Sequence, residues 1–71
     1  MNPEEIKKLT RFFRAKFQLQ TIEVRKRMQK KDSAEVYIGD EFIATVSLDA
    51  EEGGRDFTLQ MSILEIDLDG T

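Results

Sequence analysis

The sequence has 71 residues, a length that corresponds to a single small domain spanning residues 1–71. It contains no cysteine and no histidine, which excludes disulfides, thiolate chemistry and metal centres built on Cys or His ligands. Domains of this size are often stabilised by a disulfide, a metal ion or oligomerisation. Self-association is the one of these devices that the composition leaves open.

The net charge of −3 combines two segments of opposite sign. Residues 1–32 carry ten Lys or Arg and four Asp or Glu, whereas residues 33–71 carry one Arg and ten Asp or Glu. Such a split indicates either a binding face for an acidic partner or charge complementarity within one fold. No segment has the apolar length of a signal peptide or a membrane span, so we expect a cytoplasmic protein with no membrane partner.

Residues 3–16 are predicted to form an amphipathic helix. Asn2 is a suitable N-cap residue, Pro3 suits the first helical position, and Glu5 can complete a capping box. At ~100° per residue, one side of this helix is basic and the other is apolar. The apolar side consists of Ile6, Leu9, Phe12, Phe13 and Phe17. We expect these phenylalanines, together with Phe42 and Phe57, to form the core, with Phe12 at the edge of the apolar arc.

The spacing of apolar residues then changes from 3.6 to 2, which predicts four strands. These strands cover residues 21–28, 34–38, 42–48 and 57–63. Their short connections imply an antiparallel meander, so the expected fold is α+β in the order α-β-β-β-β, with the helix on the apolar face. Residues 64–71 fit a strand continuation, a short helical turn or a frayed acidic end.

The register of the hairpin at residues 39–40 depends on its loop length. A three-residue loop, Gly39–Glu41, pairs Ile38 with Phe42 and keeps the apolar residues of both strands on one face. A two-residue loop pairs Ile38 with Glu41 and divides that face. We therefore favour the three-residue loop, although a β-bulge would have the same effect.

A basic face on the helix and the first strand is the first candidate binding surface. Its residues are Lys7, Lys8, Arg11, Arg14, Arg25 and Arg27. Clustered basic residues suit an acidic protein or the phosphates of a nucleic acid, but a solvated face that balances the acidic segment has the same pattern. The acidic net charge and the lack of aromatic residues among the outward basic ones argue against nucleic acid.

Tyr37 and Ile43 form the second candidate surface. Both are expected on the sheet face opposite the helix, where an apolar pair can seed a dimer contact. Scattered apolar residues on a surface commonly have no role, and this is the alternative interpretation.

No catalytic, metal-binding or cofactor-binding residue is predicted. The acidic residues of the loop at 49–56 lack the ligand spacing of a calcium-binding loop. The serines have no histidine that could act as a base, and the glycines form no phosphate-binding pattern.

The opening segment NPEEIKKL and the central segment DSAEVYIGDEFIATVSLD resemble a family of short bacterial proteins of unknown function. The resemblance covers nearly the whole chain and implies a small stand-alone protein, but it brings no activity and no functional residue. Our leading hypothesis is a non-enzymatic protein that acts through protein–protein interaction, including self-association as a homodimer. The alternative is a weak nucleic-acid-binding module that uses the basic helix face and the first strand.

Overall fold

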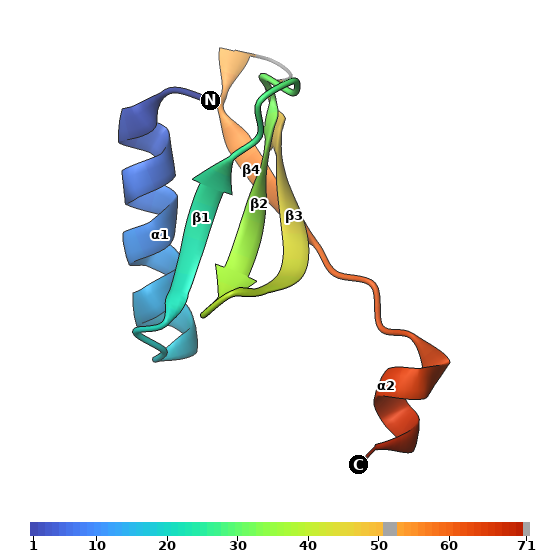
Figure 1. Ribbon diagram of the computed structural model, residues 1–71. Helices are drawn as coiled ribbons and strands as arrows, with labels where there is room; N and C mark the ends of the chain where they lie inside the picture. The colour runs from blue at the N-terminus through green and yellow to red at the C-terminus, as the bar shows by residue number, and fades with distance from the viewer. Residues whose placement is uncertain (51–52, 71) are drawn as a thin grey trace.

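The computed structural model describes residues 1–50 and 53–70 (Figure 1). Its elements are α1 (Pro3–Phe17), β1 (Ile22–Lys26), β2 (Ser33–Ile38), β3 (Glu41–Asp49), β4 (Asp56–Gln60) and α2 (Glu65–Asp69). The strands form one antiparallel four-stranded sheet in the order β1-β2-β3-β4. The predicted α+β meander is therefore confirmed, with a short second helix added. Glu51 and Glu52 of the predicted acidic loop lie outside the described residues.

Helix α1 begins at the predicted capping box. The Asn2 side chain accepts a hydrogen bond from the Glu5 amide at 2.8 Å, and the Glu5 carboxylate accepts one from the Asn2 amide at 3.3 Å. The helix ends at Phe17, one residue later than predicted. Gln18 takes a left-handed conformation with φ of 53°, and its amide donates to the Arg14 carbonyl, which satisfies one of the last carbonyls of the helix.

The core lies between α1 and one face of the sheet. Leu9 and Phe13 of α1 pack against alternate residues of the first three strands, because side chains at every second strand position share a face. The strand residues of the core are Ile22, Val24, Ala34, Val36, Ala44 and Val46. Strand β4 contributes only the partly buried Phe57.

The β2–β3 hairpin turns on Gly39 and Asp40, so the predicted three-residue loop is wrong. Ile38 pairs with Glu41, as a two-residue loop requires. Gly39 has φ of 62°, and tight hairpin turns of this length need positive φ, which glycine adopts without steric cost.

A β-bulge restores the register of the apolar face. Val36 pairs with Ala44 and Tyr37 pairs with Phe42, which leaves Ile43 as the extra residue on β3. The bulge keeps Ala44 in the core but places Phe42 beside Tyr37. The prediction that Phe42 belongs to the core is therefore wrong, and its ring is half-exposed.

Two strands are shorter than predicted. β1 ends at Lys26, and Met28, predicted as part of that strand, is fully exposed. β4 ends at Gln60, which pairs with Thr45, rather than at residue 63. The bulge at Ile43 lies just beyond this pair and bends β3, so a straight β4 cannot stay in register with it. The chain then leaves the sheet and forms α2, one of the three alternatives for this segment (Figure 1).

Candidate interaction surface

The predicted basic face divides into three separate groups in the structure. Lys7, Lys8 and Arg11 lie exposed on α1, and none of them forms an ion pair with the residues described here, 1–50 and 53–70. Arg14 lies against the edge of β1. Arg25 and Arg27 lie on the sheet face opposite α1, where they contact Glu23 and Glu35. The six side chains therefore do not form one continuous surface.

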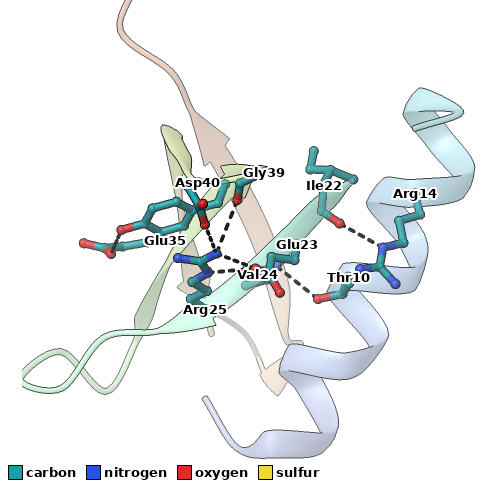
Figure 2. A network of polar contacts seen from close by, with 10 residues as sticks. Thr10, Arg14, Ile22, Glu23, Val24, Arg25, Glu35, Gly39 and Asp40 are labelled. Atoms are coloured by element: carbon teal, nitrogen blue, oxygen red, sulfur yellow. Dashed lines mark hydrogen bonds and ion pairs between the residues drawn. The ribbon is translucent and has the colours of Figure 1, made fainter. Parts of the chain in front are cut away.

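Arg14 and Thr10 seal the outer edge of β1 (Figure 2). The Arg14 Nε donates a hydrogen bond to the Ile22 carbonyl at 2.9 Å, and the Val24 amide donates to the Thr10 hydroxyl at 3.1 Å. An edge strand exposes unpaired backbone groups of this kind and can pair with another chain. Arg14 thus has a structural role, and the two contacts occupy backbone groups at Ile22 and Val24 that would otherwise be open to another strand.

Arg25 is the centre of a polar network on the sheet face opposite α1 (Figure 2). It pairs with the Glu23 carboxylate at 2.6 Å and lies 3.5 Å from the Asp40 carboxylate. Its guanidinium carbon also lies 4.0 Å from the centre of the Tyr37 ring, a cation–π contact. The hydrogen bond to Glu23 is the main reason that the pKa of Arg25 is raised. Arg27 lies 3.9 Å from the Glu35 carboxylate.

Tyr37 belongs to this network rather than to an apolar pair with Ile43. Its hydroxyl donates a hydrogen bond to the Glu35 carboxylate at 2.9 Å. Its ring packs edge-on against the Phe42 ring, with 5.8 Å between the ring centres. Ile43, in contrast, is partly buried and packs against the core. The bulge explains the difference, because it moves Phe42 into the position next to Tyr37.

The pKa of Tyr37 provides a test of this network. The hydrogen bond to Glu35, helped by burial, raises the pKa of the phenol above its usual value of 10.0. We expect Glu35→Gln to lower this pKa, because the substitution removes the anionic acceptor that favours the protonated phenol. Tyr37 is the only tyrosine, so the absorbance of the phenolate in a pH titration reports this group alone.

The raised pKa of Tyr37 also predicts the direction in which the stability of the protein changes with pH. A pKa that is raised on folding stabilises the protein fully at pH values below the unfolded pKa of Tyr, and this stabilisation is lost as pH rises through the folded pKa. The wild type should therefore lose more stability than Glu35→Gln between neutral and strongly alkaline pH. A tyrosine pKa that is the same in both proteins would contradict the contact.

An apolar groove lies between α1 and β4, a feature that the sequence patterns did not predict. Its rim contains Phe12, 56% exposed, and Phe17, 50% exposed, from the helix, with Phe57 and Leu59 from β4. The Phe17 ring stacks on the ring of the buried Phe13, with 5.9 Å between the ring centres. The prediction that Phe17 is a core residue is therefore wrong, whereas Phe12 does lie at the edge of the apolar arc.

Charged residues border this groove. Lys8 and Lys16 of α1 line it along the helix side. Just before β4, Arg55 forms a two-pronged ion pair with Glu5, with distances of 2.6 and 2.8 Å. This contact with Arg55 is the main reason that the pKa of Glu5 is lowered. The groove thus has an apolar floor and two lysines without an ion-pair partner among the described residues.

The segment from residue 61 to residue 70, called the arm below, projects away from the sheet and from α1 (Figure 1). All of its large apolar side chains are exposed, from 56% for Met61 to 73% for Ile66. These residues are Met61, Ile63, Leu64, Ile66 and Leu68. Three acidic residues alternate with them from position 65 onward, Glu65, Asp67 and Asp69. The arm is therefore apolar and acidic, and it has almost no core of its own.

Other kinds of site find little support among the described residues. No group of three or more His, Cys, Asp or Glu side chains lies close enough there to hold a metal ion. No polar or charged residue is buried within residues 1–50 and 53–70. No helix in this part of the chain is long and apolar enough to cross a membrane.

The fold and its surfaces define a small α+β protein whose distinctive features are an apolar groove and an apolar arm. The chain belongs to the family described as "Protein of unknown function (DUF3126)", which matches residues 5–67. The predicted resemblance to a family of small proteins without a known function is thus confirmed. No curated protein and no solved structure matches the chain.

Proposed function

We propose that this protein is non-enzymatic and acts by binding another protein molecule. The observation that carries the proposal is the apolar surface of the groove and the arm, which no other part of the described chain covers. Exposed apolar surface of this kind, bordered by charged residues, is typical of protein–protein interaction sites. The fold supports the same view, because a core this small gains from additional buried surface.

Nucleic-acid binding is a second proposal that rests on the free cations of α1. Lys7, Lys8 and Arg11 have no ion-pair partner among the described residues and could neutralise phosphates. Arg14, Arg25 and Arg27 are engaged within the fold. Only three of the six residues of the predicted basic face would remain for phosphate contacts, which predicts weak binding whose salt dependence is shallow. We therefore rank this function second.

A photocrosslinking experiment distinguishes the two proposals. A photoreactive phenylalanine analogue is placed at Phe12 in the groove, at Ile66 in the arm or at Met28, which is 100% exposed and lies outside both. We expect protein adducts from the first two positions in living cells and few from Met28. Equal labelling from all three positions, or nucleic acid as the only adduct, would overturn the proposal. Mass spectrometry of the adducts identifies the partner.

A further inference from the structure

We infer that the partner is a second copy of this chain, and that the arm of each copy docks in the groove of the other. This inference rests on the proposed function and specifies its partner. The resulting assembly is a two-fold dimer in which the same contact occurs twice. The reciprocal exchange doubles the buried area, which matters because a stable interface buries roughly 800 Å² on each partner.

The chemistry of the arm matches that of the groove. The arm alternates Leu64, Ile66 and Leu68 with the acidic residues of the segment 65–69, and the groove joins an apolar floor to Lys8 and Lys16 at its border. Glu5 at the border is paired with Arg55, so Lys8 and Lys16 face the single further carboxylate of Asp56, and the groove keeps a small positive excess that complements the acidic, apolar arm. The charge split between the two segments of the chain thus becomes a contact between copies.

The conformation of the arm also favours docking along a surface. Helix α2 has five residues, and isolated helices shorter than about 12 residues are marginal in water. In α2 the side chain of Ile66 points away from the face that Leu64 and Leu68 share, because positions two apart lie on different sides of a helix. In an extended segment, all three lie on one face and the acidic residues lie on the other. The arm therefore gains a single apolar face when it lies extended along the groove.

The geometry favours the groove of a second copy over the chain's own groove as the docking site of the arm. After Gln60 the chain moves away from α1, which forms one wall of that groove (Figure 1). The molecule extends 42 Å along its long axis and 23 Å along the others. To fill its own groove, the chain would have to reverse direction within Met61–Leu64, where Ser62 is the one residue of the types that favour turns. Docking on another copy needs no reversal.

Sedimentation equilibrium of the full chain tests the inference. We expect the wild type to be a dimer, and the arm variant Ile66→Asp/Leu68→Asp to raise the dissociation constant at least tenfold. Both residues are exposed, so circular dichroism of this variant should remain that of a folded protein. The groove variant Phe12→Asp should weaken the dimer similarly, whereas Met28→Asp should not, although it adds the same charge at an even more accessible apolar residue.

Mixing the arm variant with the groove variant provides the most specific test of the inference. A pair formed from the arm variant and the groove variant retains one intact contact, the intact arm in the intact groove. We expect the mixture to associate more tightly than either variant alone. A matched charge pair adds a control: Lys16→Glu should weaken the dimer, whereas Lys30→Glu, outside the groove, should not.

Two results would overturn the inference. One is a monomeric wild type, including a monomer whose arm amides are protected from hydrogen exchange by its own groove. The other is a dimer that the arm and groove variants leave intact. The failure of the inference is separable from that of the proposed function. Photocrosslinks from Phe12 and Ile66 to a different protein, together with a monomeric wild type, would contradict the dimer. They would still support the proposed function of protein binding.

Discussion

Phe13→Ala is expected to remove a large part of the stability of this protein. The Phe13 ring is 5% exposed and lies between the rings of Phe12 and Phe17 on the core side of α1. Truncation of a buried phenylalanine to alanine costs about 3–5 kcal/mol. A chain of this length has a total stability of only about 4–11 kcal/mol. Urea denaturation followed by circular dichroism should show a midpoint far below that of the wild type.

Phe42→Ala is the matched control for this prediction. The same atoms are removed, but the Phe42 ring is half-exposed and its main aromatic contact is the edge of Tyr37. Loss of such a pair costs about 0.5–1.5 kcal/mol beyond the buried area. Equal destabilisation by the two substitutions would contradict the position of the core between α1 and the sheet.

The elements that depend on local chemistry were predictable from the sequence. The capping box at Asn2, the apolar face of α1 and the alternation of residues 34–38 each determine a local structure whatever the rest of the chain does. Their consistency explains why the order of helix and strands is confirmed. The boundaries of β1 and β4 were less predictable, because they depend on pairing with other strands.

The hairpin register could not be predicted because two solutions satisfy the same burial. A three-residue loop and a two-residue loop with a bulge both place Val36 and Ala44 on the core face. They differ in the position of Phe42, which decides whether Tyr37 gains an aromatic neighbour. Alternation of apolar residues contains no information about that choice.

The groove was predictable in principle from the dimensions of the elements. A helix with its side chains is about 10 Å wide, whereas four strands spaced by about 4.8 Å span about 15 Å. One helix therefore cannot cover the apolar face of all four strands, and some of it must remain open. Contacts of α1 concentrate on β1, so the open part lies at β4, beside Phe57 and Leu59.

The arm was the least predictable segment because its local signals conflict. Alternating apolar and acidic residues at 64–69 favour a strand, yet the isolated chain places a short helix there. A strand needs a partner edge or surface, and the bulge at Ile43 removes the one that β3 would supply. The arm thus retains an alternating strand pattern outside the sheet, which is the feature that an intermolecular contact would resolve.

Thr10→Val is expected to destabilise the protein by about 1–3 kcal/mol, the cost of leaving a buried donor without a partner. The substitution conserves shape but removes the hydroxyl that accepts the Val24 amide at 3.1 Å and donates to the Ile6 carbonyl at 2.9 Å. Val24 is buried, so water does not readily replace the lost acceptor. Hydrogen exchange should show faster exchange of the Val24 amide than in the wild type.

Thr58→Val serves as the control, because Thr58 is exposed on β4 and valine is a better strand former than most residues. It should leave stability nearly unchanged and leave the Val24 amide protected. Unchanged exchange at Val24 would mean that the Thr10 hydroxyl does not protect the edge of β1.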